Sequence, residues 1–182
     1  MNPISRYTFN RLLMLCLAAA SWTAQAQAPV GSVPAVDLAR YSGQWFELAS
    51  FPMFFQRNCV GDTTAEYTAL ADGAIEVHNR CRTESGFNEA TGRATVVPGF
   101  GNGRLKVSFF WPFKADYWIV GLDPQYRWAV VGNPNRKYLW ILSRTPQLPA
   151  ELLANALAAA QAQGYDLTQL KYTLHGGASA AP

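Results

Sequence analysis

Residues 43–52 read GQWFELASFP, a run that is apolar on both of its alternating faces and carries one acidic residue, Glu47, in its middle. A strand with one face in water alternates apolar and polar side chains. A run that is apolar on both faces therefore needs apolar neighbours on either side. This stretch predicts a strand that lies inside a sandwich or lines a cavity with one of its faces.

Short apolar runs recur along the rest of the chain, and turn-forming residues such as Asp72-Gly73 and Asp123-Pro124 separate them. The expected strands lie near residues 43–51, 60–70, 74–82, 91–97, 104–111, 115–122, 127–132 and 138–144, with a last short strand at 171–174. A helix is expected between Pro149 and Gly164, because the leucines and alanines there form one apolar stripe. No crossover helix lies between strands. The sequence predicts an all-β fold, an eight-stranded antiparallel up-and-down β-barrel (calyx) with one C-terminal α-helix packed outside.

Hairpin register assigns side chains to the inside of this barrel, where a barrel of eight strands is either filled by side chains or holds one small ligand. Pairing Gly121 with Trp128 across the 123–124 turn places Tyr117 and Trp128 on the inner face. The expected ligand-facing residues are Glu47, Ala49, Phe51, Tyr67, Val77, Val107, Phe109, Tyr117, Trp128, Tyr138 and Trp140. Glu47 is expected to serve as a hydrogen-bonded strut in the wall, with contact to a polar group of a ligand as the alternative.

The first 26 residues are expected to be an export signal. Arg6 and Arg11 precede the apolar run LLMLCLAAA (12–20), and Ala24-Gln25-Ala26 supplies a small-x-small cleavage site. Cys16 raises the alternative of a lipid anchor in the outer membrane, but Leu15 precedes it where a small residue is needed. Free export to the periplasm or the medium is therefore favoured. The remaining chain divides into a linker (27–34), one domain (35–175) and a flexible tail (176–182).

The net charge and the few histidines argue against several classes of function. Without Arg6 and Arg11 the formal charge falls from +3 to +1, which does not suggest a nucleic-acid partner. The only histidines, His78 and His175, are expected to be solvated and lack metal-ligand spacing. No catalytic constellation, metal site or cofactor is predicted.

Cys59 and Cys81 are expected to form a disulfide, because the exported chain meets an oxidising compartment. Simple hairpin pairing leaves the two residues about four positions out of register, so the segment after Arg57 must bend inward for the bond to form. A reactive thiol or a metal-binding pair is the alternative.

Three motifs in this order resemble the lipocalin family, most closely its bacterial and apolipoprotein D-like members. They are Gly43-x-Trp45, Asp123-Pro124-Gln125-Tyr126 and residues 138–145 (YLWILSRT), which include Arg144. The resemblance implies a calyx that is closed at one end, open at the other and able to bind a small hydrophobic molecule. It also implies that Trp45 and Arg144 pack together at the closed end, and that the motif residues Gly43, Trp45, Asp123, Tyr126 and Arg144 are structural.

Aromatic side chains near the expected open end are interleaved with basic ones, namely Arg57, Arg82, Lys114, Arg136 and Lys137. Such a rim suits a lipid whose tail enters the calyx while an anionic headgroup stays at the mouth. We expect a non-enzymatic carrier or store of a fatty acid or lysophospholipid in the bacterial cell envelope. The protein is expected to be a monomer or weak dimer that can associate peripherally with a membrane. The alternatives are a binder of a tetrapyrrole or another small molecule, a calyx-based enzyme, and a protein-docking module.

Overall fold

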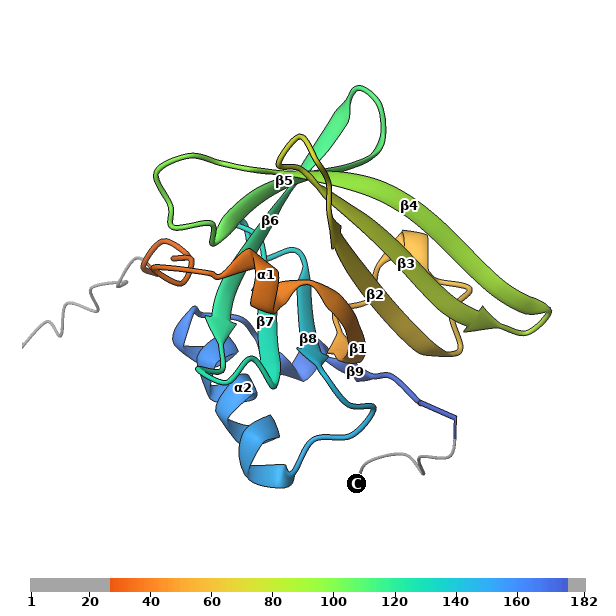
Figure 1. Ribbon diagram of the computed structural model, residues 1–182. Coiled ribbons are helices and arrows are strands. Elements are labelled where there is room, and N and C mark those ends of the chain that lie inside the picture. The colour runs from red at the N-terminus through yellow and green to blue at the C-terminus, as the bar shows by residue number, and fades with distance from the viewer. Residues whose placement is uncertain (1–26, 177–182) are drawn as a thin grey trace, which may run out of the picture.

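The structure is a computed structural model that describes residues 27–176, so the expected export signal, Cys16 and residues 177–182 lie outside the described residues. Its strands are β1 (Gly43–Ser50), β2 (Gly61–Ala69), β3 (Ile75–Thr83), β4 (Gly86–Val96), β5 (Arg104–Phe110), β6 (Phe113–Leu122), β7 (Trp128–Gly132), β8 (Leu139–Ser143) and β9 (Lys171–Tyr172). Hydrogen-bonded neighbours follow the order β2-β3-β4-β5-β6-β7-β8-β1-β9, and β1 also pairs with β2 (Figure 1). This extra pairing closes an eight-stranded antiparallel barrel and confirms the predicted fold class.

One long helix, α2 (Ala150–Ala162), packs outside the barrel against β6 and β7 (Figure 1). Its Ala156 and Ala160 are fully buried in an apolar cluster with outward-facing residues of the sheet. The helix comes close to the sheet because β6 carries Gly121 at the contact, where an added Cβ would lie 2.9 Å from the Cβ of Ala159. The barrel wall and the helix therefore form one apolar core outside the calyx.

Three short helices were not predicted: α1 (Leu38–Tyr41) and the 3-10 helices η1 (Phe54–Gln56) and η2 (Leu167–Gln169). Asp37 starts α1 by accepting hydrogen bonds from the backbone N–H groups of Ala39 and Arg40. α1 is too short for its periodicity to be visible in the sequence. Its end places Tyr41 at the closed end of the barrel, beside Trp45, with ring centroids 4.9 Å apart.

Strand β4 begins at Gly86, five positions before the expected start at residue 91. Residues 86–91 are exposed and largely polar, so they carry no apolar alternation. Their backbone nevertheless pairs with β3 from Thr83 and Gly86 onward. The ladder therefore extends beyond the part of the strand that packs on the core.

A bulge in β1 reverses the faces that were expected after Glu47. Glu47 pairs with Leu142, but Ala49, two residues later, pairs with Ile141, one position away. Ala49 and Phe51 consequently lie in the cluster that faces α2, and the Phe51 ring packs edge-on against Tyr165. The expected inward orientation of Ala49 and Phe51 is wrong.

A second bulge lies in β6, where Ile119 pairs with Val131 but Gly121 pairs with Val130. The expected pairing of Gly121 with Trp128 is therefore wrong. Trp128 faces outward and is buried against the α2 side of the barrel. Ala129 and Val131 take the inner positions of β7. A one-residue shift exchanges the two faces of a strand, because side chains alternate with a period of two.

The closed end of the barrel is sealed by Trp45, which is fully buried. The guanidinium of Arg144 lies over the Trp45 ring, 3.9 Å from its centroid. Arg144 also donates hydrogen bonds to the carbonyl oxygens of Gln44, Arg40 and Tyr41. The contact between Trp45 and Arg144 that the resemblance implied is present.

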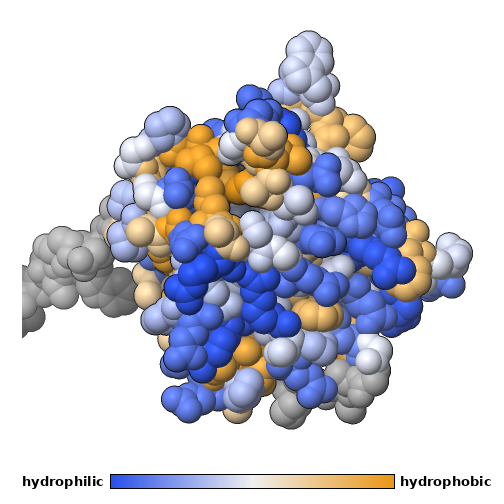
Figure 2. Space-filling view, in the orientation of Figure 1, coloured by the Kyte–Doolittle hydropathy of each residue, from blue (hydrophilic) through white to orange (hydrophobic). Residues whose placement is uncertain are grey.

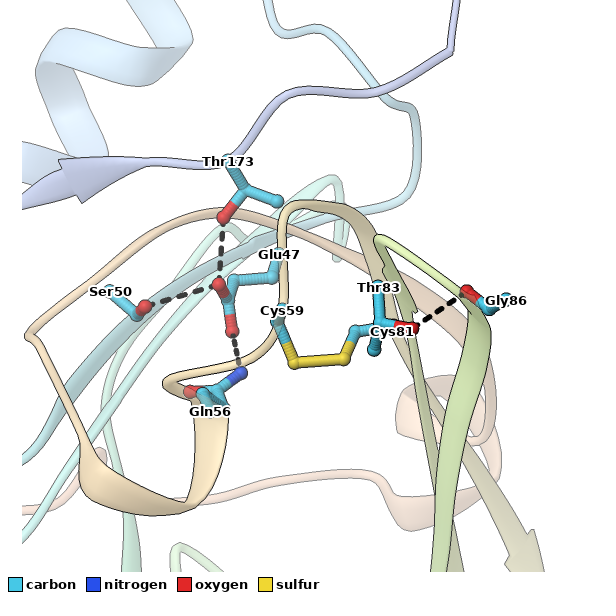
Figure 3. The surroundings of a disulfide bond; sticks show 8 residues. All are labelled: Glu47, Ser50, Gln56, Cys59, Cys81, Thr83, Gly86 and Thr173. Atoms are coloured by element: carbon cyan, nitrogen blue, oxygen red, sulfur yellow. Dashed lines mark hydrogen bonds between the residues drawn. A yellow bond between two sulfur atoms is a disulfide. The ribbon is translucent and has the colours of Figure 1, made fainter.

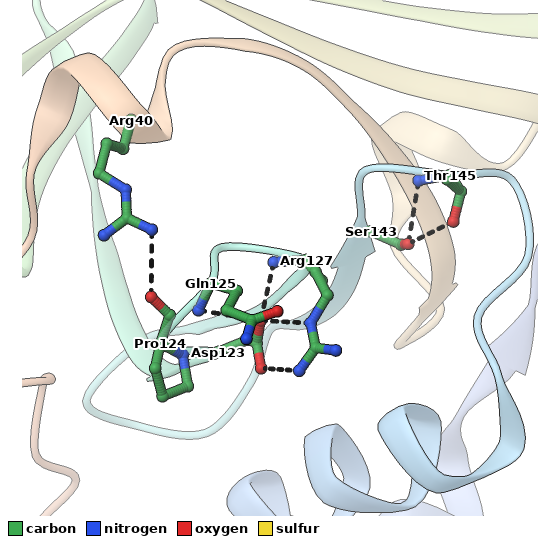
Figure 4. Close-up of polar contacts among 7 residues, drawn as sticks. All are labelled: Arg40, Asp123, Pro124, Gln125, Arg127, Ser143 and Thr145. Carbon is green, nitrogen blue, oxygen red and sulfur yellow. Dashed lines mark hydrogen bonds and ion pairs between the residues drawn. The ribbon is translucent and has the colours of Figure 1, made fainter.

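The turn between β6 and β7 also lies at the closed end (Figure 4). The buried Asp123 accepts hydrogen bonds from the backbone N–H groups of Gln125 and Arg127 and forms an ion pair with the Arg127 guanidinium. These interactions, led by the Arg127 side chain, lower the pKa of Asp123. The Tyr126 hydroxyl accepts a hydrogen bond from the N–H of Asp37, which ties the segment before α1 to this turn. The motif residues therefore build the closed end.

Candidate ligand-binding site

Three tyrosines fill the lower part of the barrel. The Tyr117 hydroxyl lies 2.8 Å from the hydroxyls of both Tyr41 and Tyr67. Burial raises the pKa of all three side chains, that of Tyr67 to about 12. The cavity beside this tyrosine cluster measures only about 10 Å³, roughly the room that one water molecule needs. The tyrosine cluster therefore leaves no room for a ligand in the lower part of the barrel, and we call this filled part the floor.

Inner-face side chains become more exposed toward the open end. Ile75, Ala94 and Leu105 are buried near the floor. The side chains that lie higher in the barrel are half-buried, namely Val107, Phe109, Tyr138 and Trp140. Trp45 seals the other end of the barrel. The inner side chains near the open end are therefore less covered than those near the floor.

The upper wall is aromatic. The rings of Tyr138 and Trp140 stack with centroids 6.0 Å apart, and the ring of Phe55 lies 6.0 Å from that of Tyr138. Phe109 lies against Gly92 on the neighbouring strand, where a Cβ would come within 2.8 Å of the Phe109 ring. The glycine lets this ring lie flat on the inner wall.

Glu47 is buried in the wall and accepts three side-chain hydrogen bonds (Figure 3). Its donors are Ser50 Oγ at 3.1 Å, Gln56 Nε2 at 2.8 Å and Thr173 Oγ1 at 2.7 Å. All three come from the chain itself, which favours the interpretation of Glu47 as a strut. None of these three donors was predicted. Thr173 could not be inferred from the sequence, since it lies 126 residues from Glu47.

The two histidines differ in how far they are buried. His175 is buried, with Nε2 2.8 Å from the backbone oxygen of Glu47, so its expected solvation is wrong. His78 is partly exposed and lies 3.4 Å from the Glu89 carboxylate. Within residues 27–176, no three His, Cys, Asp or Glu side chains gather closely enough to hold a metal ion.

The disulfide between Cys59 and Cys81 is confirmed, with the two Cα atoms 5.6 Å apart (Figure 3). An irregularity in β2, where the pairing shifts between Gly61 and Thr64, removes one position of the offset. The rest is closed by the segment before β2, which leaves the ladder and brings Cys59 beside Cys81. The N–H of Val60 donates a hydrogen bond to the carbonyl oxygen of Arg82. The bond therefore fastens residues 51–60, which we call the mouth loop, to β3.

A larger hollow of about 500 Å³ lies between the mouth loop and the C-terminal segment around β9. Glu47 and Ser50 form part of its wall, and Arg57 and Lys171 supply its positive charge. Ser50 pairs with the inward-facing Trp140, so this hollow begins beside the inner face of the barrel. Sequence reasoning did not find it, because the segments that form it are distant in the chain.

The five basic residues expected at the rim have different surroundings. Arg82 forms an ion pair with Asp62 at 2.6 Å. Arg136 donates hydrogen bonds to the carbonyl oxygens of Gln163 and Ala28, which join the end of α2 to the start of the described chain. Both guanidinium groups therefore hold the structure together. The other three are exposed: Arg57, Lys114 and Lys137.

The chain from residue 36 to residue 175 matches the family of lipocalin-like domains. It is 37% identical over 163 residues to the outer membrane lipoprotein Blc of Vibrio cholerae, covering 88% of this chain and 95% of that protein. It is 38% identical over 150 residues to temperature-induced lipocalin-1 of Arabidopsis thaliana, covering 78% and 80%. Apolipoprotein D of Mus musculus is 29% identical over 148 residues, covering 75% and 76%.

The fold is also that of solved structures with little sequence identity. Insecticyanin from the tobacco hornworm superposes with a TM-score of 0.67 at 20% identity, covering 80% of this chain and 84% of that one. Apocrustacyanin A1 from lobster gives a TM-score of 0.63 at 16% identity, covering 82% and 92%. No helix within residues 27–176 has the length and apolarity needed to cross a membrane. The barrel, its sealed end and the match over residues 36–175 together establish that this chain belongs to the lipocalin family.

Proposed function

We propose that this lipocalin binds one long-chain amphiphile, a fatty acid or a lysophospholipid, and carries or stores it in the bacterial cell envelope. The observation that supports this most is the half-exposed aromatic inner wall above a filled floor. Blc of Vibrio cholerae is named as an outer membrane lipoprotein, which supports a place in the envelope. We propose a binding role and no catalytic one.

The acyl tail would lie in the upper calyx and end at the tyrosine cluster. Its contacts would be Val107, Phe109, Tyr138 and Trp140, with Tyr67, Val77 and Tyr117 at the floor. Removing apolar surface from water contributes about 25 cal/mol per Å². Affinity should therefore rise with chain length until the tail fills the space above the floor.

The headgroup would stay at the open end. Arg57 and Lys171 line the hollow beside the mouth loop, and neither Lys114 nor Lys137 is buried. Guanidinium and ammonium groups form charge-assisted hydrogen bonds with carboxylate or phosphate. A single anionic headgroup fits this distribution of charge better than a neutral one.

Calorimetric titration of delipidated protein (residues 27–182) with fatty acids and lysophospholipids of graded chain length tests this proposal. Phe109→Asp places a carboxylate in the upper calyx and should weaken binding by about tenfold or more, because the tail would desolvate a charge. Phe87→Asp is the matched control, since Phe87 is also a strand phenylalanine, on β4, but is 52% exposed and outside the inner cluster. An affinity that does not depend on chain length, together with wild-type binding by Phe109→Asp, would rule out the calyx as the site.

A further inference from the structure

The hairpin that joins β5 and β6 ends in an exposed aromatic tip. Phe110, Trp111 and Phe113 are 78%, 90% and 77% exposed. Monomeric proteins rarely leave large apolar side chains clustered in water unless the cluster meets a partner. We call residues 110–114 (FWPFK) the hairpin tip.

The shape of the hairpin tip favours a lipid bilayer over a protein surface as its partner. The β5–β6 loop rises beyond the other strands in Figure 1, and the same region stands out from the surface at the top of Figure 2. A narrow protrusion offers little area to a flat or convex protein surface. It can, however, enter the headgroup layer of a bilayer, where amphipathic aromatic rings such as that of Trp are favoured.

The charge of the hairpin tip also favours a lipid bilayer, and specifically an anionic one. Lys114 is its only ionisable residue and is exposed. Further down the hairpin, Asp116 is paired with Lys106 at 2.7 Å, so the nearest acid on the two strands is already neutralised. An aromatic wedge followed by a free ammonium group matches an apolar interior beneath anionic headgroups.

The hairpin tip is continuous with the inner wall of the calyx. Phe110 is exposed, whereas Phe109, the residue before it, packs with the inner cluster of the barrel. An apolar path therefore runs from the hairpin tip to the inside of the barrel along one strand. A surface that contacts the hairpin tip also lies next to the open end.

We propose that the hairpin tip docks the protein on the surface of an anionic lipid bilayer, with Phe110, Trp111 and Phe113 inserted among the headgroups and Lys114 paired with lipid phosphate. This site is separate from the inner cluster of the barrel, because its aromatic side chains are exposed and none of them packs in that cluster. Docking would hold the open end against the membrane, so that a lipid could pass between bilayer and calyx with little exposure of its tail to water.

Co-sedimentation of the protein (residues 27–182) with vesicles of phosphatidylethanolamine and phosphatidylglycerol tests the proposal. The wild type should sediment with these vesicles. The triple variant Phe110→Ser/Trp111→Ser/Phe113→Ser should bind about 100-fold more weakly, the change expected if roughly 110 Å² of apolar surface is no longer removed from water. Phe100→Ser removes a partly exposed aromatic ring from the turn before β5, at the closed end, and should bind as the wild type does.

Lys114→Glu tests the charge. It should weaken binding to these vesicles roughly tenfold or more, and high salt should reduce the difference. A wild type that stays in the supernatant, or a triple variant that sediments like the wild type, overturns the proposal. The proposal is also overturned if the wild type does not bind vesicles but forms a dimer and the triple variant does not. That result would assign the hairpin tip to contact between two copies of the chain.

Two further measurements separate this proposal from the proposed function. The triple variant should bind fatty acid in vesicle-free solution as the wild type does, because its inner wall is unchanged. Phe109→Asp should lose fatty acid but still sediment with vesicles. Loss of fatty-acid binding by the triple variant would contradict the separation of the two sites.

Discussion

At the scale of single residues, the buried carboxylate of Glu47 joins its own strand to two other parts of the chain. Ser50 belongs to the same strand, Gln56 to the mouth loop and Thr173 to the segment after β9. A buried acceptor that holds three donors stabilises the fold mainly because those donors would otherwise be unpaired. Glu47 is therefore assigned a structural role.

Glu47→Ala should lower the free energy of unfolding by about 2–3 kcal/mol, because three donors lose their acceptor in a partly buried place. Urea denaturation measures the change. Glu66→Ala on the exposed face of β2 is the control and should change stability by less than about 0.5 kcal/mol. Unchanged stability with altered lipid preference would instead make Glu47 a ligand contact.

The tyrosine cluster gives stability a dependence on alkaline pH. Burial raises the pKa of Tyr67 from an ordinary value of 10.0 to about 12, and raises those of Tyr41 and Tyr117 as well. A group whose pKa is higher in the folded state contributes stability that is fully present below the unfolded pKa. That stability should be lost as pH rises from about 10 through about 12.

Spectrophotometric titration of tyrosinate, followed in parallel with circular dichroism, measures this effect. The three tyrosines of the cluster should ionise only as the fold is lost. Tyr117→Phe removes the bridging hydroxyl and should lower stability at neutral pH. If all tyrosines ionised near their ordinary pKa while the protein stayed folded, the tyrosine cluster could not be the tightly packed floor of the barrel.

At the scale of secondary-structure elements, alternation and turn residues were enough to predict the strands, the helix α2 and the order of the barrel. The motif residues at the closed end could be placed as well, because Trp45 and Arg144 lie before the β1 bulge and at the end of β8. The inward face was predicted correctly for Tyr67, Val77 and Trp140, but not beyond the bulges in β1 and β6.

The two bulges were invisible in the sequence because both faces of these strands are apolar. Ala49 and Phe51 look the same whether they face a cavity or a helix, since α2 supplies apolar surface on the outside. In β6, the close approach of α2 at Gly121 accompanies the extra residue. Alternation determines register only where one face is polar, so tertiary packing decided these positions.

The disulfide is the covalent link between the mouth loop and β3. The double variant Cys59→Ser/Cys81→Ser should lose about 3 kcal/mol of stability, because a closed loop of 22 residues restricts the unfolded chain. Denaturation midpoints of the wild type with and without reductant check the value. Equal midpoints for wild type, reduced protein and variant would show that the bond contributes nothing to stability.

At the scale of the whole molecule, the two ends of the barrel differ in chemistry. One end is sealed by Trp45, Arg144 and the Asp123 turn, with its polar groups paired within the chain. The other end carries the aromatic upper wall, the hollow beside the mouth loop and the hairpin tip. Because one end is sealed, the ligand that we propose would enter and leave at the other end, which is also the end that we propose to face a membrane.

The central claim is that a lipid tail occupies the upper calyx, and native mass spectrometry of protein purified from its own cell envelope tests it most directly. The wild type should carry one adduct with the mass of a fatty acid or lysophospholipid. Phe87→Asp and the triple variant at the hairpin tip should retain this adduct, and Phe109→Asp should lose it. No lipid adduct on the wild type, or an equal adduct on Phe109→Asp, would contradict the claim.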